Sequence, residues 1–310
     1  MPWLGESAAL ATAICWTGSS LFFALATRRA GGIAVNQFRL WLALPLLSLL
    51  HLLLLGTCWP ALDALRLLQL AVSGLVGLVL GDIGYFYALG VIGPRIGSVL
   101  MATWPAMATA LAWAFHGERA SALMLLGIAT TLAGVVLVLL RQRDGSVWLH
   151  GAPRGSVPLA VAGALLGALG QAGGSVLAAV AMAPAPDQPE ALPGLSAVLV
   201  RMAAASCGIA LVTHLLRRPA AFVAVVRDRA ALRAALLGTA FGPIAGVWLS
   251  MFAFAHASVG VAAELTATTP IFMMPVAKVA YGARVGAFGV LGTLLAVAGV
   301  VLLCCSKGAG

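Results

Sequence analysis

Two carboxylates inside long apolar runs are the first residues of this sequence that could do chemistry, Asp82 and Glu264. A charged side chain in the middle of a membrane costs roughly 2.5–3.5 kcal/mol, so it is retained where it faces water, a partner or the interior of a helix bundle. Asp82 could therefore bind a solute or a coupling proton, or instead lock two helices together by hydrogen bonds. Glu264 lies about one turn into its run, where the positive end of a helix dipole also favours a carboxylate.

Basic, amide and aromatic residues inside the apolar runs form a second group of candidates. Arg39 and Arg201 have similar places in two runs, where they could bind an anionic solute or anchor a helix at the interface. Tyr and Trp are expected mainly at membrane interfaces, so several at mid-depth suggest a cavity that stacks aromatic or amphipathic solutes. His256 is either a packed polar group or part of a proton relay. The other members are Tyr85, Trp104, Gln171 and Trp248.

Composition decides what kind of protein holds these residues. The 310 residues are 62% hydrophobic and 9% charged, with a mean hydropathy of +1.06, which leaves too little polar surface for a water-soluble globule. Apolar runs of about 20 residues indicate helices, whereas barrel strands would alternate over about 10 residues. We therefore predict an all-α, multi-pass integral membrane protein, and we place it in the cell (inner) membrane.

Several function classes are disfavoured by what the sequence contains. The net charge of +9 comes from residues in short loops and not from one continuous face, so we expect no nucleic-acid partner. The five cysteines have no metal-binding spacing, and no Gly-x-x-x-x-Gly-Lys nucleotide loop or catalytic motif occurs. We therefore expect no metal, no cofactor and no enzymatic activity.

The apolar runs divide the chain into spans. Ten transmembrane helices are predicted, at residues 6–27, 33–55, 66–91, 96–116, 121–140, 156–182, 193–216, 234–256, 260–281 and 285–305. The polar stretch 141–155 contains Asp144-Gly145 and is predicted to be a linker. It separates a first unit at 1–140 from a second at 156–305, which is followed by a short tail at 306–310.

A repeat relates the two units. Residues 81–137 match residues 246–302 without a gap at a constant offset (246 − 81 = 165), and the last five residues of each copy are identical. Since each unit has five spans, an odd number, the second is inverted relative to the first, which is the plan of many secondary transporters. Pro105 and Pro270 occupy equivalent places. Together with Pro243 they are candidate hinges that should bend their helices, either for rocking of the halves or as static bowing.

Loop charge predicts an orientation. Most of the 18 Lys and Arg residues lie on one side of a ten-span chain, including Arg28, Arg29, Arg217, Arg218 and Arg227. Positive charge marks the cytoplasmic side. Both termini are therefore expected on the opposite side of the membrane.

The repeated stretch resembles the EamA domain of the drug/metabolite transporter superfamily. The residues that carry this resemblance are Gly81-Asp82-x-Gly84-Tyr85-Phe86-Tyr87-Ala88-Leu89, Pro105 and Gly117-Glu118-Arg119, and in the second copy Gly242-Pro243-x-x-Gly246-Val247-Trp248, Pro270 and Tyr281-Gly282. The resemblance covers nearly all of the chain. Two departures are Ala283, where the family usually has a glutamate, and the orientation, since many members have cytoplasmic termini.

What the resemblance implies is ten helices around a central cavity, alternating access, and movement of small metabolites such as amino acids or drug-like solutes, often by efflux. The partners would be a solute, membrane lipids and, as one choice of coupling ion, protons. The alternatives are an intramembrane enzyme or a non-transporting, lipid-scrambling membrane protein. The sequence leaves the solute, the direction, the coupling ion and the oligomeric state open.

Overall fold

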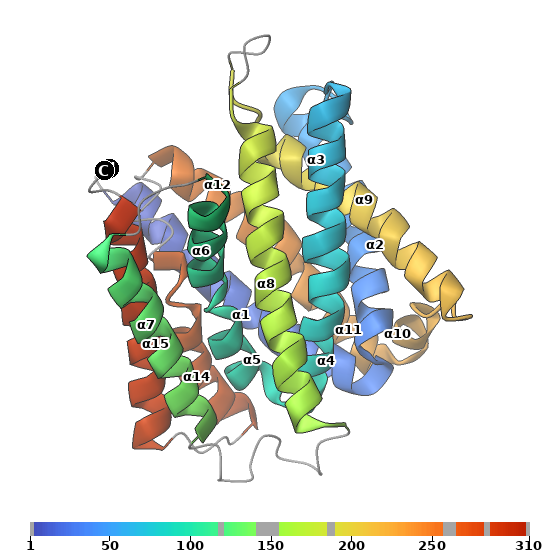
Figure 1. Ribbon diagram of the computed structural model, residues 1–310. Coiled ribbons are helices and arrows are strands. Elements are labelled where there is room, and N and C mark those ends of the chain that lie inside the picture. The colour runs from blue at the N-terminus through green and yellow to red at the C-terminus, as the bar shows by residue number, and fades with distance from the viewer. Residues whose placement is uncertain are drawn as a thin grey trace.

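Helices make up the whole ordered architecture of the described residues, which are 3–116, 121–140, 155–184, 190–256, 265–281 and 286–307 of a computed structural model (Figure 1). The first unit contains α1 (Leu4–Ala30), α2 (Gly32–Leu55), α3 (Ala64–Gly74), the π-helix η1 (Leu75–Gly81), α4 (Asp82–Val91), α5 (Gly93–Met101), α6 (Trp104–His116) and α7 (Ala122–Leu140).

The second unit follows a similar order, with the additional short helix α10, and most of the residues equivalent to α5 lie outside the described residues. It contains α8 (Val157–Met182), α9 (Gly194–Leu215), the short α10 (Val223–Arg227), α11 (Arg229–Thr239), the π-helix η2 (Ala240–Gly246), α12 (Val247–His256), α14 (Thr269–Tyr281) and α15 (Ala287–Lys307). Each π-helix continues directly into the helices on either side, so α3–η1–α4 and α11–η2–α12 each form one long rod.

Seven of the described helical segments are long and apolar enough to cross a membrane. Two shorter apolar helices, Thr269–Ala280 and Ala287–Leu303, follow near the end of the chain. The chain is therefore an all-helical, multi-pass membrane protein, as its composition predicts. The full set of ten transmembrane helices stays a prediction, because the fourth predicted span is divided between α5 and α6, and part of the ninth, residues 260–264, lies outside the described residues.

The predicted effect of two prolines is wrong in detail. Residues 96–116 do not form one bent helix: α5 ends at Met101, and α6 begins at Trp104. Pro105 is the second residue of α6, and Pro270 is the second residue of α14. Proline is tolerated in the first turn, where the missing N–H has no helical partner in any case. Pro243, by contrast, lies inside η2.

Helices from opposite units pack against each other at the centre of the molecule. In Figure 1, α8 lies beside the rod α3–η1–α4, and the two meet through glycines. A Cβ on Gly84 would come within 2.5 Å of the Gly163 carbonyl oxygen, and a Cβ on Gly170 within 2.8 Å of the Gly81 Cα. Small residues allow helix backbones to approach closely inside a membrane. The two units are therefore interleaved and do not form separate bundles.

A second close crossing joins α7 to α15, which lie side by side at the left of Figure 1. Gly127 packs against Gly299, and Gly134 packs against Gly292. Because the order of contacts is reversed along the two helices, they run antiparallel. The fifth helix of each unit is thus fixed to its counterpart, backbone against backbone.

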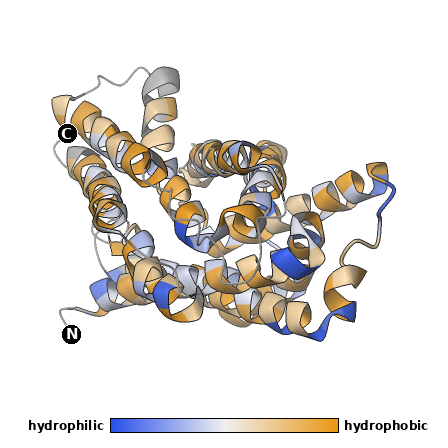
Figure 2. Ribbon diagram, turned by 90° about the horizontal axis from the view of Figure 1, so that it is seen from below, coloured by the Kyte–Doolittle hydropathy of each residue, from blue (hydrophilic) through white to orange (hydrophobic). Residues whose placement is uncertain are grey.

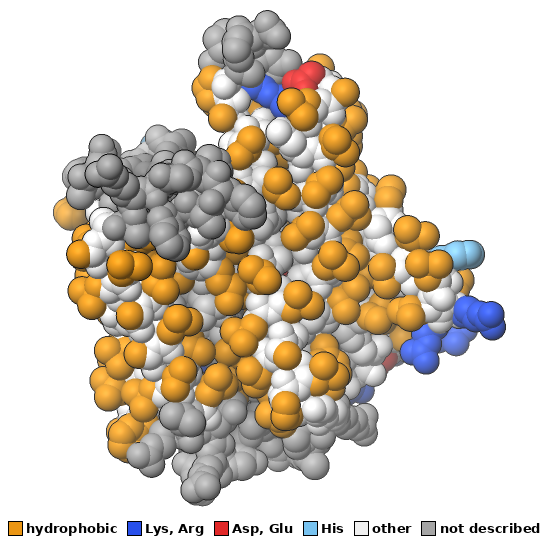
Figure 3. Space-filling view, viewed as in Figure 1, with side chains coloured by type: hydrophobic (Ala, Val, Ile, Leu, Met, Phe, Trp, Pro, Cys, Tyr) orange, Lys and Arg blue, Asp and Glu red, His pale blue; other side chains and the backbone are white. Residues whose placement is uncertain are grey.

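The outer surface of the bundle is apolar. Orange and white segments dominate the ribbons in Figure 2, and orange side chains cover most of the described face in Figure 3. Leucines that are more than half exposed, such as Leu53, Leu68 and Leu211, point outward from three different helices. Such a surface suits contact with lipid chains.

Candidate solute-binding site

An ion pair between Arg39 and Asp82 lies in the interior, where α2 meets α4. The Arg39 Nη2 donates to the Asp82 Oδ2 at 2.5 Å, and the two side chains are only 8% and 12% exposed. Asp82 is the first residue of α4, directly after η1. The carboxylate therefore does not face lipid, which removes the strongest objection to a functional role for it.

Asn36 and two aromatic rings hold the Arg39 side chain in place. The Asn36 Oδ1 accepts from the same Arg39 Nη2 at 2.9 Å, and the Asn36 Nδ2 donates to the Leu78 carbonyl oxygen of η1 at 3.1 Å. The Arg39 guanidinium carbon lies 5.1 Å from the ring centroid of Phe86 and 5.9 Å from that of Phe23, within cation–π range. The pair is thus positioned by α1, α2, η1 and α4 together.

Arg201 of α9 brings a second guanidinium to this region. Its Nη2 would lie 3.3 Å from a Cβ on Gly77 and 3.3 Å from one on Gly174, so it occupies space that only glycines leave free. The Arg201 backbone also packs directly on Gly74. Arg201 is close enough to Asp82 for their charges to attract each other. The Arg39 side chain is 8% exposed, and the Nε and Nη2 atoms of Arg201 are buried, so both guanidinium groups lie among packed helices.

Two further predicted residues lie at the same crossing. The Gln171 Oε1 of α8 is 3.7 Å from the Cβ position of Gly77, which the Arg201 Nη2 also approaches. The Tyr85 hydroxyl, one turn after Asp82, lies 3.3 Å from the Ser20 Oγ of α1. We call Arg39, Asp82, Tyr85, Gln171 and Arg201 the central polar cluster.

The other candidates are not part of this cluster. Trp248 and His256 lie on α12, which packs against α1, and they form a row of rings with Phe252 between them. His256 is exposed, and its Nδ1 is 2.9 Å from the Phe252 carbonyl oxygen. Trp104 is the first residue of α6. Glu264 lies outside the described residues.

Asn36, Phe23 and Phe86 are the members of the site that sequence reasoning missed. One signal was available, because Asn36 precedes Arg39 by three residues and must share its helix face. The two phenylalanines give no signal, since aromatic residues are common throughout apolar runs.

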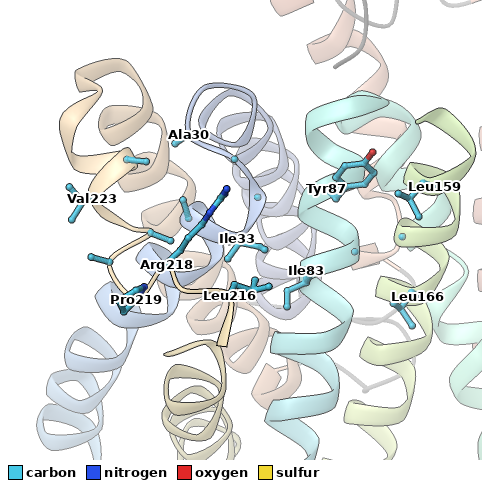
Figure 4. A pocket seen from close by; sticks show the side chains of 18 of the residues that line it. Ala30, Ile33, Ile83, Tyr87, Leu159, Leu166, Leu216, Arg218, Pro219 and Val223 are labelled. Atoms are coloured by element: carbon cyan, nitrogen blue, oxygen red, sulfur yellow. The ribbon is translucent and has the colours of Figure 1, made fainter. Parts of the chain in front are cut away.

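An open groove lies nearer the arginine-rich end of the molecule. It encloses about 1230 Å³ between the α1–α2 turn, α4, α8 and the segment from α9 to α10. Figure 4 shows Ile33, Ile83 and Leu166 along its walls, with Arg218 beside them. Arg227 and the Tyr87 side chain also line it. This groove is separate from the central polar cluster, none of whose members lines it.

The fold places this chain in the class of all-helical, multi-pass membrane proteins, with a buried ion pair at its central crossing. The profile of the EamA-like transporter family matches residues 3–140 and again residues 159–305. The chain belongs to this family, and the resemblance seen in the sequence is confirmed. The family consists of membrane transporters, so a small-molecule solute is the expected partner.

Comparison with solved structures supports the fold. One structure, described only as a crystal structure of a protein, matches with a TM-score of 0.60 and covers 96% of this chain and 95% of its own. Its sequence identity to this chain is 17%, so the match supports the fold alone. No curated protein matches the chain.

Proposed function

We propose that this protein is a secondary-active exporter of small organic metabolites, such as amino acids or drug-like solutes, in the cell (inner) membrane. Solute would cross by alternating access between the inverted units, with the arginine-rich side facing the cytoplasm. The observation that supports this most directly is the buried Arg39–Asp82 pair at the central crossing. A charged pair in a membrane interior is expensive, and such residues mark solute and ion pathways.

The pair suggests how coupling would operate. Asp82 is held by Arg39 when no other cation is present, and a proton or a cationic group of the solute could replace Arg39 as its partner. Arg39 also contacts Asn36, whose amide is bonded to η1. Release of Asp82 would therefore loosen the contact between α2 and the π-helix, which is the segment that joins α3 to α4. Tyr85 and Gln171 would line the path next to Asp82.

Flux through proteoliposomes tests this proposal. Vesicles holding the wild-type chain, loaded with an equimolar mixture of amino acids, organic acids, amines and sugars, should release selected compounds with saturable kinetics. Asp82→Asn should abolish this release. Glu190→Gln, which removes an exposed carboxylate outside the central polar cluster, should not. An imposed pH gradient should change the wild-type rate if protons are the coupling ion.

Three results would refute the proposal: no saturable release by the wild-type chain, equal release by Asp82→Asn, or chemical conversion of a compound without release. Scrambling of labelled lipid in the same vesicles, without solute flux, would support the lipid-scrambling alternative instead.

A further inference from the structure

The charges at the central crossing do not balance. Among the described residues, Asp82 supplies one negative charge, and Arg39 already uses it. Arg201 adds a second positive charge, and its Nε and Nη2 are both buried without a hydrogen-bond partner in the described part of the chain. A buried charged donor without an acceptor is strongly unfavourable. No acceptor among the described residues reaches these two N–H groups of Arg201.

The Nε and Nη2 atoms of Arg201 specify the shape of an acceptor that would satisfy them. Nε and Nη2 form one edge of the guanidinium plane, and their N–H bonds are parallel. A carboxylate offers two oxygens at the matching separation and binds such an edge in bidentate fashion. The glycines at positions 77 and 174 leave the guanidinium its space, and the Gln171 Oε1 lies close to the same Gly77. The geometry describes a receptor for a planar anion, formed by α8, α9 and η1.

We propose that Arg201 binds a carboxylate group of the transported solute through Nε and Nη2, so that the protein selects organic acids or amino acids over neutral and purely cationic compounds. This inference rests on the proposed transport function. Binding of one carboxylate brings the net charge of the crossing from +1 to zero. Asp82 remains free to hold Arg39 or to accept the amino group of an amino acid.

The flux mixture described above tests the inference. The compounds released by the wild-type chain should all carry a carboxylate, and Arg201→Gln should lower their apparent affinity roughly ten- to hundredfold. Arg201→Lys, which keeps the charge and loses the bidentate edge, should lie between the two. Release of sugars or amines at the same rate as acids, with Asp82→Asn still inactive, would overturn the anion site and leave the transporter proposal standing.

A stability measurement needs no substrate. Without solute, Arg201→Met removes an unpartnered buried cation and should leave the melting temperature of the purified protein unchanged or higher. Arg39→Met is the matched control, because it leaves Asp82 without its partner and should lower the melting temperature. If Arg201→Met lowers it as much as Arg39→Met does, Arg201 is a structural residue and the inference is wrong.

The groove at the arginine-rich end carries a second, independent inference. Its walls include exposed leucines of α8, Leu159 and Leu166, which are seven residues and therefore about 10 Å apart along the helix. Its charged lining consists of Arg218 and Arg227, both exposed. Figure 3 shows basic side chains gathered at the lower right, where α9 ends. The groove thus combines a cationic end with a long apolar wall.

This combination matches an anionic phospholipid, whose phosphate would sit at the arginines while an acyl chain follows α8. Juxtamembrane arginines attract anionic lipid by about 1 kcal/mol each. We infer that the groove binds one anionic phospholipid of the leaflet on the arginine-rich side.

Native mass spectrometry of the protein released from mixed phosphatidylglycerol and phosphatidylcholine vesicles tests this. One phosphatidylglycerol should stay bound to the wild-type chain and to Arg229→Gln/Arg233→Gln, which removes two exposed charges outside the groove. It should be lost from Arg218→Gln/Arg227→Gln. Ala162→Trp, which fills the groove, should also release it, whereas Leu169→Trp on the exposed face of α8 should not. Equal retention of both lipids, or retention by the two groove variants, would overturn the inference.

Discussion

The two rods α3–η1–α4 and α11–η2–α12 show what the repeat preserves and what it changes. Every boundary in the second rod lies at the repeat offset from the first: α3 begins at Ala64 and α11 at Arg229 (229 − 64 = 165), and each rod contains a π-helix of seven residues. The N-caps correspond as well. The Asp63 side chain caps α3, and the Asp228 side chain caps α11.

The residues that follow the two π-helices differ. The first rod has Asp82 there, paired with Arg39, and the second has Val247 (247 − 82 = 165). The partners differ too, because the first rod packs against glycines of α8, whereas Gly242 of the second contacts Ser19 of α1. The repeat therefore preserves the backbone of the two rods. The proposed chemistry depends on Asp82, a residue in which the two rods differ. π-Helices occur frequently at functional sites, and here both copies carry one while only the first has the charge.

Exchange of the two residues after the π-helices should have the largest effect. Asp82→Val leaves Arg39 charged and without its partner in the interior, which should destabilise the protein by about 3–5 kcal/mol. Val247→Asp introduces a carboxylate into the second rod and should cost about 2.5–3.5 kcal/mol. The double variant should restore neither stability nor flux. Thermal unfolding in detergent measures the effect, and recovery in the double variant would show that the two positions are interchangeable.

Gly84→Ala should have the next largest effect. The added Cβ would lie 2.5 Å from the Gly163 carbonyl oxygen, a backbone atom that can move only with the whole of α8. Overpacking of this kind costs about 1–3 kcal/mol. Gly173→Ala is the control, because its Cβ would meet only the Val76 side chain, at 3.8 Å. A melting temperature of Gly84→Ala equal to that of Gly173→Ala would contradict the close crossing.

Pro243→Leu should have a smaller effect. It places in η2 the residue type that η1 has at the equivalent position, Leu78 (243 − 78 = 165), and η1 forms the same π-helix without proline. Stability should therefore be unchanged or slightly raised, and flux should fall far less than in Asp82→Val. A complete loss of flux in a stably folded Pro243→Leu protein would establish the proline as a hinge.

Asp228→Asn should have the smallest effect, and that effect should depend on pH. The backbone N–H of Ala231 and the Arg29 side chain, which donate to the carboxylate, lower the pKa of Asp228. An aspartate whose pKa is lowered in the folded state stabilises the protein at pH values above its ordinary pKa of about 3.9. This stabilisation is lost as the pH falls through the lowered pKa. Wild type should therefore melt slightly above Asp228→Asn at pH 7, and the difference should shrink in acid. A constant difference would exclude the carboxylate charge as its source.

The helices of this molecule are easier to predict from its sequence than the contacts between them. Hydrophobic runs predict the helices because they depend on local composition, and the constant repeat offset relates the elements of one unit to those of the other. The break between α5 and α6 is not predicted, since Pro105 fits either a bent helix or the first turn of a new one. Asp82 and Arg39 were both singled out, but no pattern showed that they pair with each other. That pairing depends on the rotation of α2 against α4, which side-chain types alone do not determine.

The crossing of α7 and α15 has the symmetry of a dimer interface. A Cβ on Gly127 would meet Leu303, and a Cβ on the equivalent Gly292 would meet the equivalent Val138. In the same way, Gly134 faces Ala296, and Gly299 faces Thr131. Each contact therefore has a symmetric counterpart at the repeat offset. Reciprocal contacts of this kind define an isologous interface, which two copies of one polypeptide form about a two-fold axis. Within one chain, α7 and α15 are therefore joined in the way that two subunits of a symmetric dimer are joined, and the covalent connection fixes the ratio of the two copies at one to one.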